Sequence, residues 1–198
     1  MCGLIAFTGN ADPAYVQQLA DQARRRGPDS VGICWRFEEE WYRLARRAPS
    51  WPEPFALNLP LATAGIGHAR LATSGAGIED AQPLMIEDMV FAHNGTVYRH
   101  QEMAAAYGLQ TTGGNDSEVL GRLFRLFGYD AEGALEEVRD HQGETPHAFI
   151  AAEGNRMWLG SFGQPLYIRE ECWARYACSW RFPGGIEVPK GEVLRWEL

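Results

Sequence analysis

The chain has 198 residues, 45% of them hydrophobic, and a formal net charge of -8 at pH 7. This length and composition argue against a disordered chain, and we expect a single domain with its own core over residues 1–198. The acidic charge argues against a nucleic-acid surface, and no apolar run approaches the ~20 residues of a membrane span, so we expect a cytoplasmic protein that binds neither.

The first half of the chain predicts short strands around one helix. Asp12 is a suitable N-cap and Pro13 a suitable first helical residue, and apolar residues at helical spacing predict a helix that continues to Gly27. Glu38–Glu40 is expected at the tip of a hairpin, and the prolines of residues 49–60 predict an irregular surface segment. The expected strands are Gly3–Phe7, Val31–Phe37, Trp41–Arg47, Ala64–Ala69 and Met85–Ala92.

The second half predicts helices followed by short strands. A run of strands, then helices, then strands again favours two stacked sheets with helices outside, which is an α+β fold. Periodicity alone does not specify the fold further. The expected helices are Gln101–Tyr107, Ser117–Phe127 and Ala131–His141, and the expected strands are His147–Ala152, Arg156–Gly160, Leu166–Ile168, Arg175–Ser179 and Glu192–Glu197.

Cys2 is the most informative residue of the sequence. Cysteine is small enough to permit removal of Met1, which would leave Cys2 with a thiol and a free α-amine. An α-amine titrates at roughly 7.7–8.0, so it can accept the thiol proton without a neighbouring histidine. The alternative is a buried cysteine at the start of a strand.

The remaining cysteines carry no chemical signature. Cys34, Cys172 and Cys178 form no CxxC pair and lie among apolar residues, so we expect them to pack in the core of a reduced protein with no metal or other cofactor. His68 and His93 are expected to position the backbone or to pack, rather than to act as a catalytic base.

Four further segments contain residues that can do chemistry. They are RGPDSVG from Arg26, GHARLATSG from Gly67, FAHNGTV from Phe91 and NDSEVL from Asn115. Each segment taken alone is also consistent with a turn or a helix cap. In this order, after a cysteine at position 2, they resemble the class II glutamine amidotransferases. This is the glutaminase domain found in asparagine synthetase, amidophosphoribosyltransferase and glucosamine-6-phosphate synthase. The resemblance extends from Cys2 to about Leu123.

The resemblance implies a role for each matched residue. Cys2 corresponds to the nucleophile that attacks the side-chain amide of glutamine. Asn94 and Gly95 correspond to the donors that bind the oxyanion, through a side-chain amide and a backbone N–H. Arg70 is expected to bind the α-carboxylate of the substrate, and Asp116 its α-ammonium group.

Two further positions are expected near the substrate. Thr73 lies in the segment of residues 71–77, which resembles the loop that closes over bound glutamine. Arg26 is expected to brace the site close to Asn94. Arg25, Leu71 and Ser74 depart from the pattern of the sugar-phosphate synthases, which weakens an assignment to that branch.

The fold implied by the resemblance is the four-layer αββα sandwich of the N-terminal-nucleophile (Ntn) hydrolases, with two antiparallel sheets. The leading hypothesis is a free-standing glutaminase that gives glutamate and passes ammonia to a separate acceptor or synthase enzyme. One alternative is an independent hydrolase of a γ-glutamyl amide or peptide. Another is a catalytically silent subunit that senses glutamine and retains Met1.

Overall fold

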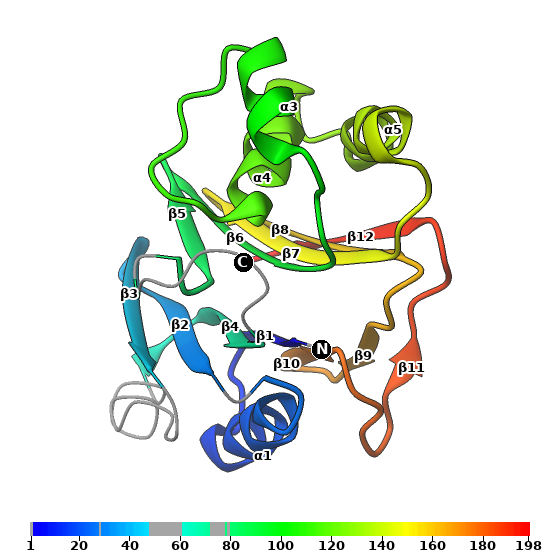
Figure 1. The fold of residues 1–198 in the computed structure, drawn as a ribbon. Coiled ribbons are helices and arrows are strands. Elements are labelled where there is room, and N and C mark those ends of the chain that lie inside the picture. The colour runs from blue at the N-terminus through cyan, green and yellow to red at the C-terminus, as the bar shows by residue number, and fades with distance from the viewer. Residues whose placement is uncertain (1, 28, 48–60, 72–77, 79) are drawn as a thin grey trace.

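Two antiparallel sheets lie face to face, and helices cover both outer faces (Figure 1). The structure, a computed structural model, describes residues 2–27, 29–47, 61–71, 78 and 80–198. The predicted helix before Gly27 lies against the seven-stranded sheet, and the three helices of the second half lie against the five-stranded sheet. The expected αββα sandwich is therefore confirmed.

The first strand of the chain lies at the centre of the larger sheet. The order of this seven-stranded sheet is β11-β9-β10-β1-β4-β2-β3, and all of its pairings are antiparallel. Its strands are β1 Gly3–Gly9, β2 Ser30–Phe37, β3 Glu40–Arg47, β4 Ala64–Arg70, β9 Tyr167–Glu170, β10 Ala174–Cys178 and β11 Ile186–Glu187.

The smaller sheet has five strands in the order β12-β8-β7-β6-β5. It is built from β5 Leu84–Ile86, β6 Met89–Asn94, β7 His147–Glu153, β8 Arg156–Phe162 and β12 Glu192–Glu197. The helices are α1 Pro13–Arg24 on the larger sheet, and α3 His100–Ala106, α4 Asp116–Leu126 and α5 Ala131–Gln142 on the smaller one. None of the described helices is long and apolar enough to cross a membrane.

Strand β1 is buried on both faces because its side chains alternate between two clusters. Leu4 and Ala6 face the second sheet, whereas Ile5 and Phe7 pack with the apolar residues of α1. Gly3 allows α1 to approach closely, since a Cβ at this position would lie 2.3 Å from the carbonyl oxygen of Ala23. The position of β1 is therefore fixed from both sides.

The helix that follows β1 begins where the sequence predicts. The Asp12 carboxylate accepts a hydrogen bond from the backbone N–H of Ala14 at 2.9 Å, and Pro13 is the first helical residue. The acidic hairpin tip is also found, because Glu38 and Glu39 adopt positive φ angles between β2 and β3. Residues 48–60 lie outside the described residues, so the predicted irregular segment there stays a prediction.

Three expectations from the sequence are wrong. The single strand predicted over Met85–Ala92 is a hairpin, β5–β6, because Glu87 adopts a φ of 55° and reverses the chain. The strand predicted at Leu166–Ile168 is β9, shifted toward the C-terminus, and it pairs with the unpredicted β11. Cys172 is exposed in the turn between β9 and β10, whereas Cys34 and Cys178 are buried as expected.

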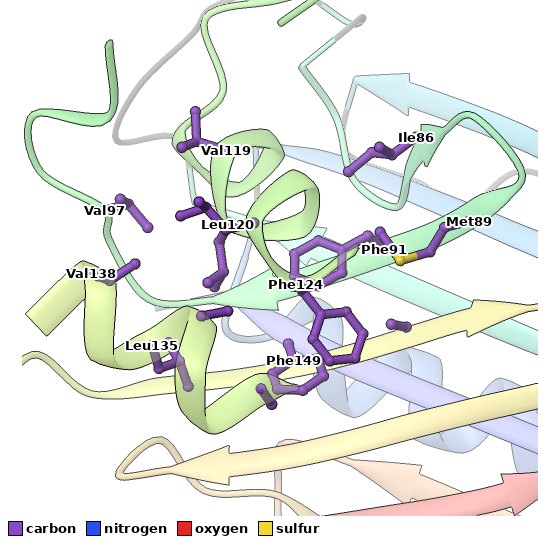
Figure 2. Packing of buried hydrophobic residues seen from close by; sticks show 14 of the residues in the cluster. Ile86, Met89, Phe91, Val97, Val119, Leu120, Phe124, Leu135, Val138 and Phe149 are labelled. Carbon is purple, nitrogen blue, oxygen red and sulfur yellow. The ribbon is translucent and has the colours of Figure 1, made fainter. Parts of the chain in front are cut away.

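Phe91, Phe124 and Phe149 lie among aliphatic side chains in the core between the smaller sheet and its helices (Figure 2). Phe124 of α4 packs onto β6 and β7, with its ring centroid 6.5 Å from that of Phe91 and 5.1 Å from that of Phe149. Trp158 of β8 contacts the same ring edge-on at 5.8 Å. These ring contacts attach α4, which begins at Asp116, to the sheet whose strand β6 ends at Asn94.

Replacing Phe124 with Ala should lower the free energy of unfolding by about 3–5 kcal/mol, because it leaves a cavity among these rings. The matched change Leu126→Ala, at a side chain that is 57% exposed in the same helix, should cost less than about 0.5 kcal/mol. Urea denaturation of both variants measures the difference. Equal losses would contradict the packing described for α4.

Candidate active site

The register of β1 and β4 brings Cys2 next to Arg70. Gly3 pairs with Ala69, so the two strands continue with Cys2 opposite Arg70. The backbone N–H of Leu71, the residue after β4, donates a hydrogen bond to Cys2 Sγ at 3.3 Å. Both side chains therefore lie at the same end of the central strand pair.

The environment of the Cys2 thiol keeps it protonated at rest. Burial raises the pKa of this thiol, and the Asp116 carboxylate adds to the rise. The N–H of Leu71 and the Arg70 cation act in the opposite direction and lower it. Because burial is the largest effect, the thiol needs a base before it can act as a nucleophile.

Asn94 joins the second sheet to Cys2. It is the last residue of β6, it is 3% exposed, and its Nδ2 donates to the backbone carbonyl of Cys2 at 3.1 Å. A side-chain amide has two hydrogens, so this bond occupies only one of them. Gly95 follows with a φ of +149°, a conformation that favours glycine.

A cavity of about 310 Å³ opens beside these residues. Cys2, Asn94 and Gly95 all line it, so the nucleophile predicted from the sequence and the two predicted oxyanion donors face one space. The rest of the lining consists of Leu71, Thr96, Tyr98, Thr145, Pro146 and Gln164.

Asp116 lies at the start of α4 but is not the N-cap. Asn115 caps the helix by accepting from the N–H of Ser117 at 2.9 Å. The Asp116 carboxylate instead accepts a hydrogen bond from the N–H of Val97 at 2.7 Å and is 5% exposed. Asp116 and Arg70 are close enough to act on the Cys2 thiol, although neither lines the 310 Å³ cavity.

Arg26 contacts the segment that follows β10. Its Nη1 donates to the backbone carbonyl of Ser179 at 2.6 Å, and its guanidinium lies 5.8 Å from the centre of the Trp180 ring. Ser179 in turn bonds to the backbone of Leu4 in β1. These contacts agree with a bracing role, and the expected proximity to Asn94 stays a prediction.

Thr73 and Met1 fall outside the described residues, as do residues 72–77 of the predicted loop, which begins at Leu71. Their expected roles therefore stay predictions. Among the residues that the structure describes, no three His, Cys, Asp or Glu side chains are grouped so that they could hold a metal ion.

The sequence did not indicate a buried hydrogen-bonded pair of histidines beside the cavity. His93 Nε2 and His147 Nδ1 are 2.9 Å apart, and both rings are almost fully buried. His147 Nε2 lies 2.8 Å from Thr145 Oγ1, which lines the Cys2 cavity. No motif marked His147 or Thr145; the only available signal was that a strand was expected to begin at His147, opposite the strand that contains His93.

Burial lowers the pKa of three histidines. The pKa of His68 falls to about 3, through burial and then through the nearby Arg70 cation. Burial lowers the pKa of His147 to about 4, and it lowers that of His93 well below 6.5, with an added effect from His147. All three rings are therefore neutral near pH 7.

Comparison with known protein families gives a match over half of the chain. The model of a family described as a glutamine amidotransferase domain matches residues 36–137. The chain is also 32% identical, over 149 residues, to glutamine–fructose-6-phosphate aminotransferase (isomerizing) of Rhizobium leguminosarum bv. viciae. That alignment covers 70% of this chain and 24% of the relative. The chain spans less than a third of the length of the first curated relatives that it matches.

Solved structures share the fold. Glutamine phosphoribosylpyrophosphate amidotransferase from B. subtilis matches with a TM-score of 0.77 and 22% identity, over 98% of this chain and 47% of that one. A glutamine aminotransferase class-II domain protein from Silicibacter pomeroyi matches with a TM-score of 0.63 and 17% identity, over 98% of this chain and 94% of that one. At these identities the likeness establishes the sandwich and its topology.

The buried histidines make stability depend on pH. The unfolded chain binds protons at these rings below about pH 6.5, whereas the folded chain does not bind them until the pH is much lower. The stability that these neutral rings contribute is therefore fully present above pH 6.5 and decreases as the pH drops toward 4. We expect a lower urea midpoint at pH 5 than at pH 7.

The variant His68→Gln should show a smaller fall between these two pH values, because one buried ring no longer takes up a proton on unfolding. His100 lies on α3 and is not buried, so His100→Gln should keep the fall of the wild type. If both variants keep it, buried His68 does not contribute to the pH dependence.

Proposed function

Because the chain belongs to the class II glutamine amidotransferase family, we propose that it hydrolyses the side-chain amide of glutamine through a thioester on Cys2. The observation that carries the proposal is the cavity that Cys2, Asn94 and Gly95 share. A thiol and two oxyanion donors facing one space suit the attack of sulfur on an amide carbonyl.

The proposed reaction begins with removal of Met1, which frees the α-amine of Cys2. The amine takes the thiol proton, and the thiolate attacks the carboxamide carbon. The oxyanion that forms accepts hydrogen bonds from Asn94 Nδ2 and from the backbone N–H of Gly95. Ammonia leaves with the proton returned by the amine, and water then hydrolyses the thioester to glutamate.

The thiol environment is consistent with this order of events. Burial favours the protonated thiol, so the proton has to pass to a base before the sulfur can attack. The Leu71 N–H, 3.3 Å from the sulfur, stabilises the thiolate when it forms. The α-amine supplies a base of suitable pKa at the same residue.

Arg70 and Asp116 provide the two charges that an amino-acid substrate requires. A guanidinium binds a carboxylate through two parallel hydrogen bonds, and a carboxylate pairs with an ammonium group. Both side chains are at most 6% exposed and lie close enough to Cys2 to influence its thiol. We assign the α-carboxylate to Arg70 and the α-ammonium to Asp116, with Thr73 as a further substrate contact.

We further propose that the ammonia passes to a separate acceptor enzyme. The curated relatives include glutamine–fructose-6-phosphate aminotransferase, whose name joins glutamine to a second substrate. Free ammonia is mostly protonated at neutral pH, so direct transfer to an acceptor preserves the nucleophile. A γ-glutamyl anilide that turns over much faster than glutamine would instead favour an independent γ-glutamyl hydrolase.

The nucleophile is tested with 6-diazo-5-oxo-L-norleucine, a glutamine analogue that alkylates such thiols. Intact-mass measurement should show a protein without Met1 that gains one adduct, and peptide mapping should place the adduct on Cys2. Cys2→Ala should gain no adduct and should release no ammonia from glutamine. Adduct formation elsewhere, or turnover by Cys2→Ala, would refute the assignment.

The substrate contacts are tested by affinity. Arg70→Ala and Asp116→Asn should each raise the KM for glutamine by about 10- to 100-fold, because each removes charge-assisted hydrogen bonds of about 1.5–3 kcal/mol. Arg25→Ala, at an exposed residue after α1, should leave KM unchanged and serves as the matched control. An unchanged KM in the first two variants would mean that the substrate binds elsewhere.

A further inference from the structure

The two buried histidines meet because of the register between β6 and β7. His93 pairs with Phe149, and His147 lies two residues before Phe149, so both rings project from the same face of the sheet. The rings stack with centroids 5.1 Å apart and an interplanar angle of 22°. The distance of 2.9 Å between His93 Nε2 and His147 Nδ1 is that of a hydrogen bond.

Gly95 lies against the two ring nitrogens that make this hydrogen bond. A Cβ at Gly95 would lie 2.5 Å from His93 Nε2 and 2.6 Å from His147 Nδ1, which are contacts that no real side chain makes. The same glycine lines the cavity that contains Cys2. The histidine pair therefore packs directly against Gly95, whose backbone N–H is the proposed oxyanion donor.

The hydrogen bond between the two histidines is part of a longer chain of hydrogen bonds. At the His93 end of this chain, a backbone group fixes the orientation of Gln82. The N–H of His93 donates to Gln82 Oε1 at 2.6 Å, so the other amide atom, Nε2, is a donor. It donates to Ser117 Oγ at 3.0 Å, and that oxygen lies 3.0 Å from His93 Nδ1.

The other end is fixed in the same way. Gln142 Nε2 donates to the backbone carbonyl of Thr96 at 2.9 Å and to Thr145 Oγ1 at 2.6 Å. Thr145 Oγ1 also lies 2.8 Å from His147 Nε2. Thr145 thus joins the histidine pair to the rim of the Cys2 cavity.

Two directions of donation are possible along this chain, and they differ in which hydroxyl hydrogen has no acceptor. If Ser117 donates to His93 Nδ1, each ring donates from Nε2, and the remaining hydrogen belongs to Thr145 at the edge of the cavity. In the reverse direction the remaining hydrogen belongs to Ser117, which is 2% exposed and whose hydroxyl has no further hydrogen-bond partner among the described residues.

An unpaired donor in the interior costs free energy, whereas one that faces a cavity can bond to water or ligand. The first direction is therefore favoured. Both rings are then neutral and protonated on Nε2, in agreement with the lowered pKa values of His93 and His147.

We propose that His93, His147 and Thr145 are positioning residues that hold the backbone N–H of Gly95 in the direction needed to bind the oxyanion. The inference rests on the proposed function, since it assigns that role to Gly95. The chain of hydrogen bonds ties the two rings that lie against Gly95 to α4 through Ser117 and to α5 through Gln142. Loss of a link lets the rings move, and Gly95 moves with them.

The experiment compares Thr145→Val, which keeps the shape but loses the hydroxyl, with Thr145→Ser, which retains it. In Thr145→Val we expect kcat for glutamine hydrolysis to fall by about 10- to 100-fold, because the oxyanion donor is misplaced. KM should stay within about twofold of the wild type, because Arg70 and Asp116, which are proposed to bind the charged groups of the substrate, are unchanged. Thr145→Ser should recover most of kcat.

Alkylation of Cys2 by iodoacetamide gives a readout that does not need the oxyanion donors. Its rate should be the same in the wild type and in Thr145→Val. Equal kcat values in the two Thr145 variants, or a change in KM alone, would overturn the proposal. If Thr145→Val fails to fold, Ser117→Ala serves as the second variant, with the same fall in kcat expected and an unchanged kcat contradicting the proposal.

Nitrogen NMR of the histidine rings separates this proposal from the proposed function. In the wild type both His93 and His147 should be protonated on Nε2 and not on Nδ1, whatever the enzyme acts on. A wild type that releases no ammonia from glutamine would refute the function alone. Rings protonated on Nδ1 would refute the hydrogen-bond chain even in an active glutaminase.

Discussion

The antiparallel register between β1 and β4 is the constraint on which the candidate site depends. It places Cys2 opposite Arg70 at one end of the central strand pair, and a shift of one strand by one residue would put the two side chains on opposite faces of the sheet. The register is well specified because β1 is buried on both faces, between α1 and the second sheet. The second sheet then brings the end of β6 to the same place, where Asn94 bonds to the Cys2 backbone.

In the proposed mechanism, the site combines a thiol that burial holds protonated with oxyanion donors that are held in place before the reaction. A nucleophile of this kind is silent until a base acts on it, which gives the α-amine exposed by removal of Met1 a decisive part in the proposed chemistry. The oxyanion donors, in contrast, have to be in position before the reaction starts, because an oxyanion is stabilised by dipoles that are already oriented toward it. We propose that the histidine pair in contact with Gly95 meets that requirement with two neutral rings.

Much of this arrangement could be predicted from the sequence. The layers followed from the order of strands and helices together with the resemblance, and the local signals at Asp12 and Glu38–Glu40 were sufficient for a helix start and a hairpin. The turn at Glu87 was missed because no glycine, asparagine or proline marks it, and its positive φ is imposed by the pairing of β5 with β6. His147 was missed because it matters through its register against β6, which no local pattern encodes.

The most direct test of the account is to stop the reaction with acid during glutamine turnover and measure the intact mass of the protein. The account predicts a protein without Met1 that carries a γ-glutamyl group, bound as a thioester and located on Cys2 by fragmentation. A protein that releases ammonia from glutamine while it retains Met1, or that carries the acyl group on another residue, would contradict the account.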